Sequence, residues 1–299
     1  MSNNIEIAVH IRSIINDEQF ERLFTHLKGF YDSDLFSKTN LEKHTSLNVT
    51  RLYVGDEFCP HRLPILKKLK EFSRFALEKQ LSLTMLTPPM SDREIARHSN
   101  LFEYLNDNHD NKEVVANDIG VILYLKKKFP LLRLAAGRLL NKAFKDPRLM
   151  DAEGLSAHSK EAEILLNECT FDNEALQKMM TGLNVRRLEQ DLLPYGDSTI
   201  QTISGICTSL YFPFGAITSG RICWISTFDQ PEKFWFMPID KCSRPCESLR
   251  LNLKNKNFAF QVVQGGNTIF YLYPLARLAD LLDKADRQDI RLVYQGYAL

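Results

Sequence analysis

Hydrophobic and polar positions alternate along this chain with two different periods. Short apolar runs, or apolar residues at every second position, indicate β-strands, and apolar residues three and four positions apart indicate amphipathic helices. In the first half the two patterns take turns: strands are predicted at 5–11, 49–55, 81–88, 113–118 and 131–137, and helices at 16–30, 61–80, 91–107 and 119–129. Ser91 and Glu94 form a capping-box signature at the start of the third helix. Strict alternation with short loops predicts a parallel sheet with right-handed crossovers.

The second half of the chain is less regular. A helix is predicted at 172–183 and a strand at 184–193. The apolar run 206–218 contains Pro213 and Gly215, which indicate a bent strand or a turn. Strand–helix–strand character returns after residue 258. The number of units predicts an α/β fold, a TIM-like (β/α) barrel that is complete or partial. A doubly wound sheet is less favoured because no Gly-rich phosphate turn follows the first strand.

The whole chain, 1–299, is expected to be a single barrel domain. Residues 1–48 would supply an N-terminal strand, a helix and a loop. Residues 206–250 would form an insertion that carries a cluster-binding loop in the C-terminal half.

Composition limits the classes of function. Lys and Arg number 38 against 37 Asp and Glu, a balance that argues against non-specific nucleic-acid binding, although a local basic groove stays open. No apolar run reaches the roughly 18 residues of a membrane span, and the first residues lack a secretory signal pattern. We therefore expect a cytoplasmic protein without a transmembrane segment. In a reducing compartment, cysteine patterns indicate metal binding or catalysis before they indicate disulfides.

Four of the six cysteines stand in a suggestive arrangement. Cys59 follows the predicted strand 49–55, and Cys223 precedes the C-x3-C pair formed by Cys242 and Cys246. Thiolates hold iron–sulfur clusters or zinc, and buried cysteines without a ligand are also common. From the residues alone the cluster is favoured, and zinc and unliganded thiols remain open. The other two cysteines, Cys169 and Cys207, are expected to be packing residues.

Several motifs occur in the order typical of one family: YVGDEFCPHR, VANDIGVILYL, RLAAGRLLNKAFKDPR, TSGRICWIS, KCSRPC and IRLVYQG. From about residue 49 onward the chain resembles the collagenase-like peptidase family (peptidase family U32), and within it the UbiV-like branch. The resemblance implies a [4Fe–4S] cluster on Cys59, Cys223, Cys242 and Cys246. It also implies a role in oxygen-independent hydroxylation of ubiquinone precursors, in a heterodimer with a related subunit.

Two other functions remain open. Some members of the family take part in hydroxylating RNA bases, so the chain is alternatively an RNA-modification factor. It is otherwise a non-catalytic scaffold subunit, stabilised by zinc or free of metal. Whether the chain is itself the enzyme is open, but peptidase activity is not expected, because the sequence has neither a G-x-S-x-G elbow nor an H-E-x-x-H motif.

Three further positions are candidates for the surroundings of the site. His61, two residues after Cys59, would support the cluster by hydrogen bonding, or it lies exposed in the first turn of the next helix. Asn117 and Asp118 follow a predicted strand, where barrel enzymes carry their chemistry, or they cap the next helix.

Two pairs of polar residues add to these candidates. Arg138 and Asn141 would bind an anionic substrate or lie in a solvated loop. Glu189 and Asp191 alternate along one strand and therefore share a face. They would do acid–base chemistry in the barrel mouth, or face solvent at a sheet edge.

Overall fold

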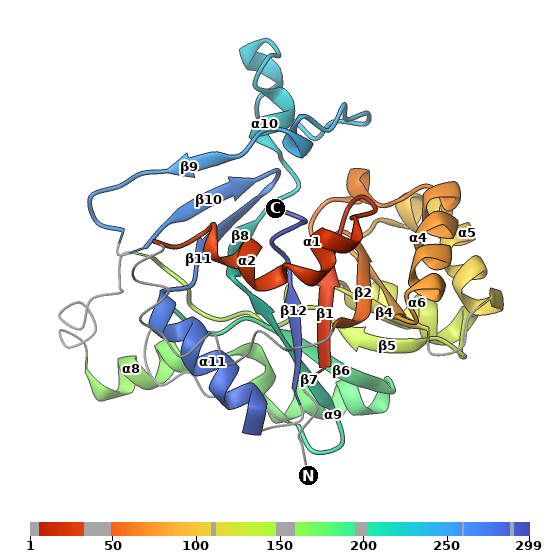
Figure 1. Cartoon of the computed structure of the whole chain (residues 1–299), viewed down its shortest axis with the longest axis horizontal. Helices are drawn as coiled ribbons and strands as arrows, with labels where there is room; N and C mark the ends of the chain where they lie inside the picture. The colour runs from red at the N-terminus through yellow and green to blue at the C-terminus, as the bar shows by residue number, and fades with distance from the viewer. Residues whose placement is uncertain are drawn as a thin grey trace.

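The computed structural model describes residues 6–32, 49–108, 112–147, 159–194, 203–258, 260–287 and 290–299. Parallel strands from these residues close into an eight-stranded barrel (Figure 1), which confirms the predicted TIM-like α/β fold. The strands follow one another around the barrel in the order β1 (Glu6–His10), β12 (Ile290–Tyr294), β7 (Cys207–Phe212), β6 (Val185–Gln190), β5 (Arg133–Ala136), β4 (Glu113–Ala116), β3 (Ser82–Thr87) and β2 (Val49–Gly55). Residues 33–48, which include most of the predicted N-terminal loop, lie outside the described residues.

Helices surround the barrel (Figure 1). They are α1 (Asp17–Glu21), α2 (Leu23–Lys28), α4 (Leu66–Glu78), α5 (Asp92–Asn108), α6 (Ile119–Lys128), α8 (Lys160–Asn167), α9 (Glu174–Gly182) and α11 (Leu275–Arg287). The capping box at α5 is confirmed, since the Ser91 N–H donates to Glu94 Oε2 at 2.6 Å and the Glu94 N–H donates to Ser91 Oγ at 3.4 Å. In the part of the chain that the structure describes, no helix has the length and apolar character that crossing a membrane requires.

Two helical segments differ from their predicted bounds for local reasons. The segment 16–30 forms two short helices because Arg22, with φ −101° and ψ 30°, leaves helical geometry between them. The helix predicted from residue 61 starts only at Leu66. Pro64 lacks an N–H and disfavours helical geometry in the residue before it, so the chain first makes a short 3-10 turn, η2 (Pro60–Arg62).

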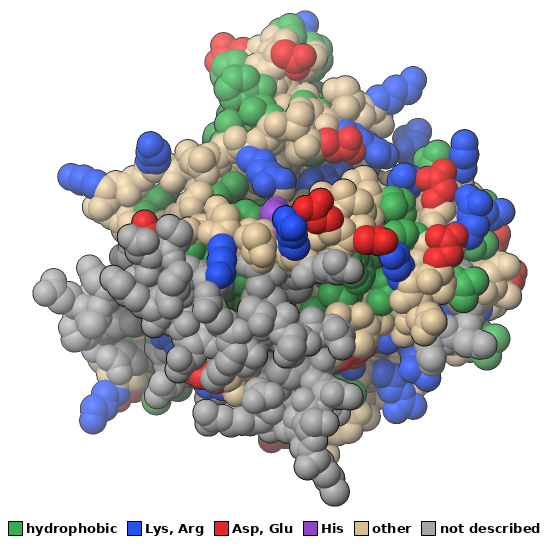
Figure 2. All heavy atoms as spheres, viewed as in Figure 1, with side chains coloured by type: hydrophobic (Ala, Val, Ile, Leu, Met, Phe, Trp, Pro, Cys, Tyr) green, Lys and Arg blue, Asp and Glu red, His purple; other side chains and the backbone are tan. Residues whose placement is uncertain are grey.

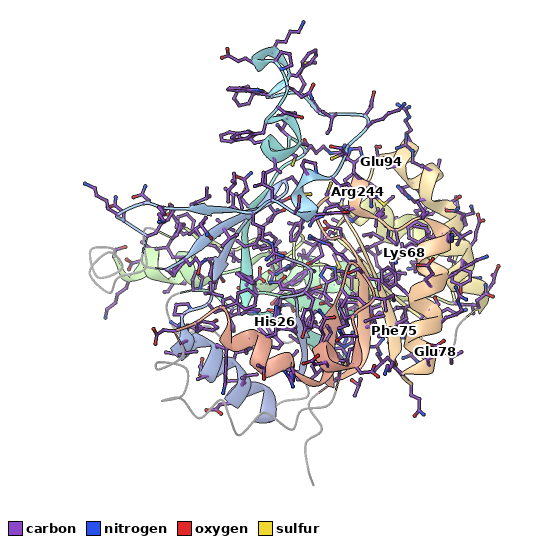
Figure 3. All side chains as sticks on the ribbon, turned by 45° about the horizontal axis from the view of Figure 1, so that its top comes forward. His26, Lys68, Phe75, Glu78, Glu94 and Arg244 are labelled. Atoms are coloured by element: carbon purple, nitrogen blue, oxygen red, sulfur yellow. The ribbon has the colours of Figure 1, made fainter. Side chains whose placement is uncertain are left out.

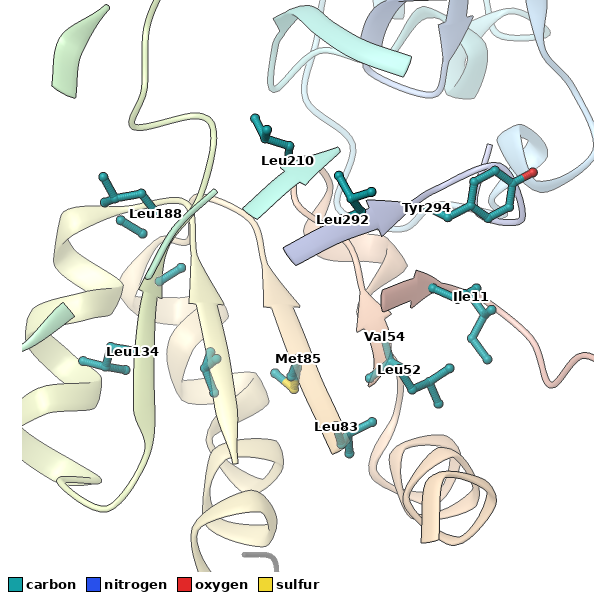
Figure 4. Close-up of a cluster of buried hydrophobic side chains, with 14 of the residues drawn as sticks. Ile11, Leu52, Val54, Leu83, Met85, Leu134, Leu188, Leu210, Leu292 and Tyr294 are labelled. Carbon is teal, nitrogen blue, oxygen red and sulfur yellow. The ribbon is translucent and has the colours of Figure 1, made fainter. Parts of the chain in front are cut away.

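Apolar side chains form two layers, one on each side of the barrel wall. Between strands and helices lies the larger core, part of which is drawn in Figure 4 with Leu52, Val54 and Met85 labelled. The residues that alternate with this core along the strands face the barrel interior, because strand side chains point to opposite faces in turn. They include Ala8, Tyr53, Leu86, Val115, Ala135, Tyr211 and Val293.

One end of the barrel interior is filled by charged side chains. Glu6 Oε1 accepts a hydrogen bond from Arg51 Nε at 2.7 Å, and Glu6 Oε2 accepts one from Arg291 Nε at 2.8 Å. Arg291 also pairs with Glu113. Glu6, Arg51, Glu113 and Arg291 all lie toward the amino ends of their strands. This layer closes the end of the barrel opposite to the one where barrel enzymes carry their sites.

A second, antiparallel sheet is inserted between β7 and α11. Its strand order is β8 (Phe214–Ser219), β11 (Thr268–Leu272), β10 (Val262–Gly265) and β9 (Leu251–Leu253). The apolar run 206–218 is thus two strands. Pro213 separates them because it has no N–H to donate to a ladder. The predicted insertion range 206–250 therefore begins with a barrel strand, β7, and the inserted sheet continues beyond it to Leu272.

The inserted sheet carries an arm that projects from the body of the molecule. The arm includes α10 (Trp224–Thr227) and the short turn η4 (Glu232–Phe234), and it returns through a further turn, η5 (Pro245–Glu247), to β9 (Figure 1). Hydrophobic side chains gather on this projection in the space-filling view (Figure 2). Because β8 follows the carboxyl end of β7, the base of the arm lies near the carboxyl ends of the barrel strands.

Candidate functional site

Cys59 lies in a turn whose shape is fixed by its neighbours. Strand β2 ends at Gly55, whose φ of +100° is in the region that favours glycine. The buried Asp56 then folds the chain back, because its Oδ1 accepts hydrogen bonds from the backbone N–H groups of Phe58 and Cys59, both at 2.9 Å. The sulfur of Cys59 is thus placed at the carboxyl end of the barrel.

Asp56 also anchors two arginines beneath this turn. Its Oδ2 lies 3.3 Å from Arg12 Nη2 and 3.3 Å from Arg62 Nη1. Burial raises the pKa of Asp56, and Arg12 opposes that rise. The Arg62 side chain is buried, yet its Nε and Nη2 groups have no hydrogen-bond partner among the described residues. The floor of the Cys59 turn is therefore rich in buried positive charge.

The other three predicted ligands belong to the inserted segment. Cys223 follows β8 and directly precedes α10. Cys242 and Cys246 lie on either side of a tight turn in which Arg244 takes a left-handed conformation, with φ 60°. In this turn the Arg244 N–H donates to Cys242 Sγ at 3.3 Å, and Cys246 is buried within η5.

Two side chains tie the Cys59 turn to the inserted segment. Asn267, in the hairpin between β10 and β11, donates from Nδ2 to the carbonyl oxygens of Phe58 at 2.8 Å and Gly220 at 2.6 Å. His61 Nε2 lies 3.0 Å from the carbonyl oxygen of Ile239, so this nitrogen carries the proton and donates. The predicted supporting position of His61 is therefore beside the site, where it joins two of its segments.

All four cysteines line one cavity of about 560 Å³. The opposite wall is built from the ends of barrel strands and the loops that follow them, including Pro89, Asn117, Ile119 and Leu140. Glu94, labelled in Figure 3, also lines the cavity. Cys59 and Cys246, which are far apart in the sequence, thus face the same space.

The thiols interact electrostatically with one another. Burial raises the pKa of Cys59 well above its usual range, and Asp56, Cys223 and Cys246 add to that rise. Burial likewise raises the pKa of Cys246 to about 11, with Arg12 opposing the rise and Cys223 and Cys242 adding to it. Each of these thiols is therefore costly to ionise beside the others unless a cationic group binds them together.

The site suits an iron–sulfur cluster in its donor chemistry. Among the described residues, no three or more His, Cys, Asp or Glu side chains converge closely enough to hold a single metal ion. Thiolates are nonetheless the donors that hold iron–sulfur clusters, and four thiols line this cavity. A thiolate-ligated cluster is net anionic, and the unpaired Arg62 donors supply the positive charge that stabilises such a group when buried.

Of the predicted polar residues Asn117 and Asp118, one has the capping role that was considered for them. Asp118 caps α6, since its Oδ1 accepts from Gly120 N at 2.6 Å and from Val121 N at 3.3 Å. Asn117 is buried and bridges two strand ends, because it donates to the carbonyl of Thr87 at 3.1 Å. Both residues also line the cysteine cavity.

Arg138 lies in a buried ion-pair network, so the expectation of a solvated loop is wrong for it. Its Nη2 is 2.7 Å from Glu57 Oε2, and its Nη1 is 2.7 Å from Asp191 Oδ1. Lys145 completes the network at 2.7 Å from Asp191 Oδ2. Sequence reasoning missed Glu57 and Lys145. The position of Glu57 at a strand end, directly after Asp56, is a signal that would have drawn attention to it.

Glu189 and Asp191 share a face as predicted, and that face is inside the barrel. The alternative of a solvent-facing edge is wrong, because β6 lies between β5 and β7 and a closed barrel has no edge. Glu189 is fully buried and accepts from Tyr53 Oη at 3.0 Å. Burial raises the pKa of Glu189. At Asp191 burial is outweighed by Arg138 and Lys145, which lower the pKa.

These interior residues are separate from the cavity wall. Arg138, Asn141, Glu189 and Asp191 are not among the residues that line the cysteine cavity. Asn141, also buried rather than solvated, accepts from Phe171 N at 3.3 Å. The structure therefore brings the four cysteines together with His61, Asn117 and Asp118, and places the other four candidates outside the lining of that cavity.

The two remaining cysteines differ from each other. Cys169 is half-buried and packs against the main core, as expected. Cys207 is exposed, so the expectation that it packs inside is wrong. It is the first residue of β7 and lies at the amino-end rim of the barrel, where the apolar run has not yet entered the core.

Comparison with known proteins adds little. No family model matches the sequence, and no curated protein matches it. A solved structure of a glycoside hydrolase family 18 N-acetylglucosaminidase from Paenibacillus barengoltzii is similar over 98% of this chain and 95% of its own, with 9% identity and a TM-score of 0.33. The barrel assignment rests on the strand pairing described above.

Proposed function

We propose that this chain is an iron–sulfur protein whose [4Fe–4S] cluster is held by Cys59, Cys223, Cys242 and Cys246. The observation that carries the proposal is the position of these four thiols around one cavity at the mouth of the barrel. Within such a site the cluster would supply one-electron redox chemistry. A cytoplasmic location, where thiols stay reduced, is part of the proposal.

The chain's own residues would prepare the site and exclude water from it. Asp56 holds the Cys59 turn, and Asn267 and His61 hold that turn against the inserted segment. Arg12 and Arg62 offset the negative charge of four thiolates in a buried place. The rest of the cavity, walled by Pro89, Ile119 and Leu140 among others, would receive a substrate beside the cluster.

For the substrate we propose a ubiquinone precursor, hydroxylated without molecular oxygen at the expense of a small-molecule oxygen donor. The support is the motif resemblance, together with a cavity of about 560 Å³ that has apolar and polar walls. A related subunit would complete the enzyme as a heterodimer. The exposed hydrophobic arm beside the site is a surface on which such a subunit would pack.

A second candidate, an RNA base hydroxylation factor, is favoured by one observation. A groove on α4 is lined by Lys67, Lys70, Arg74 and Tyr104. Basic side chains with an aromatic ring among them are suited to single-stranded nucleic acid. Binding of tRNA or rRNA fragments at low salt that is lost on Lys70→Gln plus Arg74→Gln would favour this candidate over the first.

The cluster is tested by iron and sulfide analysis of protein purified without oxygen. We expect about four irons and four sulfides per chain, as a cubane requires. Replacing any one of the four cysteines by Ala should remove most of the iron, because a cubane that loses a thiolate ligand is labile. Cys207→Ala is the matched control, since this exposed thiol is remote from the site in the fold, and it should retain full iron.

Full iron in all four single variants would contradict the proposal. So would zinc as the bound metal of the anaerobic protein, which would favour a scaffold subunit with a single-ion site instead.

A further inference from the structure

A second pocket lies behind the cysteine cavity. It has a volume of about 340 Å³ and opens beside the ends of β1 and β2, between α4 and the turn that contains Arg244. Arg62 lines both this pocket and the cysteine cavity, so one side chain forms part of the wall between them. The pocket lies at the carboxyl end of the barrel, the end where barrel proteins bind ligands.

Four cationic side chains line this pocket and come from four separate segments. Arg12 follows β1, Arg62 belongs to η2, Lys68 lies on α4, and Arg244 lies between Cys242 and Cys246. Figure 3 labels Lys68 and Arg244 on these last two segments. Placing several cations around one pocket costs electrostatic free energy, because they repel one another. An anion bound in the pocket would offset that cost.

The carboxylates near the pocket offset only part of this charge. Glu247 is the one carboxylate among the lining residues, and it lies 3.5 Å from Arg244 Nη1. Glu71 pairs with Lys68 at 3.0 Å, and Asp56 lies fully buried behind Arg12 and Arg62. Moreover, the buried atoms Arg12 Nε, Arg62 Nε and Arg62 Nη2 are without a hydrogen-bond partner among the described residues.

The rest of the lining is apolar. Ile11, Pro64, Ile65 and Phe72 form it together with the backbone at Gly55. Apolar walls exclude water and strengthen the attraction between a bound charge and the cations around it. A pocket of this size, in which apolar walls are combined with placed polar groups, is suited to a small molecule.

We infer that this pocket binds a small organic anion, a carboxylate or phosphate group on a short apolar body. The guanidinium groups of Arg12 and Arg62 and the end groups of Lys68 and Arg244 would meet the charged group, since arginine bonds carboxylate and phosphate oxygens in pairs. The apolar body would lie against Ile65 and Phe72. This site goes beyond the proposed function and does not depend on a cluster.

Binding of an anion in this pocket would also affect the cysteine cavity. An anion that engages Arg12 and Arg62 competes with Asp56 for both arginines. Asp56 in turn holds the N–H groups of Phe58 and Cys59. The anion site is thus joined to the Cys59 turn by one carboxylate, which offers a route by which a bound metabolite alters the cysteine centre.

The test is titration calorimetry of the full-length protein with three separate probes: benzoate, inorganic phosphate and the neutral benzamide. We expect benzoate or phosphate to bind and benzamide not to bind. Lys68→Gln combined with Arg244→Gln should weaken anion binding by roughly tenfold or more, because each removes a charge next to the ligand. These side chains are about two-fifths exposed, so the variant should fold.

Arg133→Gln is the control, because Arg133 is exposed at the amino end of β5, away from this pocket, and its loss should leave anion binding unchanged. The inference is overturned if neither anion binds, if benzamide binds as well as benzoate, or if the double variant binds anions as tightly as the parent. Because no result here depends on iron, failure of this inference is distinguishable from failure of the cluster proposal.

Discussion

Gly55 and Asp56 set the position of Cys59 at the scale of single residues. Gly55 takes φ +100°, and a Cβ placed on it would lie 2.4 Å from the carbonyl oxygen of Leu86 on the neighbouring strand. Asp56 can fold back onto the N–H groups of Phe58 and Cys59 only because the chain turns in this way. The strand–glycine–acid motif is thus a requirement of backbone geometry at the end of β2.

Gly55→Ala should destabilise the protein by about 2–4 kcal/mol, because alanine is strained at positive φ and its methyl group collides with backbone. Gly182→Ala is the matched control. Gly182 ends α9, and a Cβ built on it would have nothing within 4 Å. Alanine there should therefore increase the free energy of unfolding by at most about 1 kcal/mol. Urea unfolding of the two variants measures both changes. Equal effects of the two substitutions would refute the role given to Gly55.

The hairpin between β10 and β11 joins the inserted sheet to the barrel at the scale of elements. Asn267 at its tip holds one carbonyl from the Cys59 turn and one from the segment before Cys223. Gly266 beside it has φ +66°, and a Cβ built on it would lie 3.6 Å from Cys246 Sγ. The hairpin therefore joins the Cys59 turn to the segment before Cys223, and its Gly266 lines the cysteine cavity together with Cys246.

Asn267→Asp should cost about 2–3 kcal/mol, because an ionised carboxylate cannot donate and would face two carbonyl oxygens. Asn255→Asp is the control at another turn of the same sheet. There the Asn255 Oδ1 accepts from Asn257 N at 2.9 Å, a role that Asp retains. Chemical unfolding of both variants decides the point. If Asn255→Asp lowers the free energy of unfolding as much as Asn267→Asp does, the effect comes from added negative charge on the sheet and not from the lost hydrogen bonds of Asn267.

The sequence predicted most barrel strands because a buried parallel strand is a short apolar run, and each such run is followed by a helix with its own period. It could not predict the inserted sheet in the same way. β9 has only three residues, too few to show a period, and β8 continues the apolar run of β7. The four cysteines were singled out through their motifs. Their common cavity could not be predicted from spacing, because Cys59 and the inserted segment are brought together by tertiary contacts such as those of Asn267.

The barrel interior determines how the whole molecule responds to acid. Although burial raises the pKa of Glu6, Arg291 and Arg51 lower it to about 2, below the usual 4.5. A carboxyl whose pKa is lower in the folded state gives stability above pH 4.5 and loses it as the pH falls toward 2. Burial lowers the pKa of His10 to about 3, so His10 also makes the folded state lose stability as the pH falls from 6.5 to 3.

Glu6→Gln should therefore lower the free energy of unfolding by about 2–3 kcal/mol at pH 7, with part of the full linkage value lost to solvent screening. The difference from the parent should shrink toward zero as the pH falls to 2. The His10 contribution is present in both proteins and cancels in the comparison. Urea unfolding at several pH values between 7 and 2.5 gives the result, and a difference that stays constant with pH would contradict it.

The distance along the chain between Cys59 and the other three cysteines of the cavity has a consequence for the order of events after synthesis. Cys59 belongs to the second barrel strand and its turn, and Cys223, Cys242 and Cys246 follow the seventh strand in the chain. Contacts between segments so far apart form late, because closing so long a loop costs entropy. That cost is offset only once the intervening chain has folded. The four thiols meet only in a nearly finished barrel, so anything that needs all of them is acquired by a folded protein and not by the growing chain.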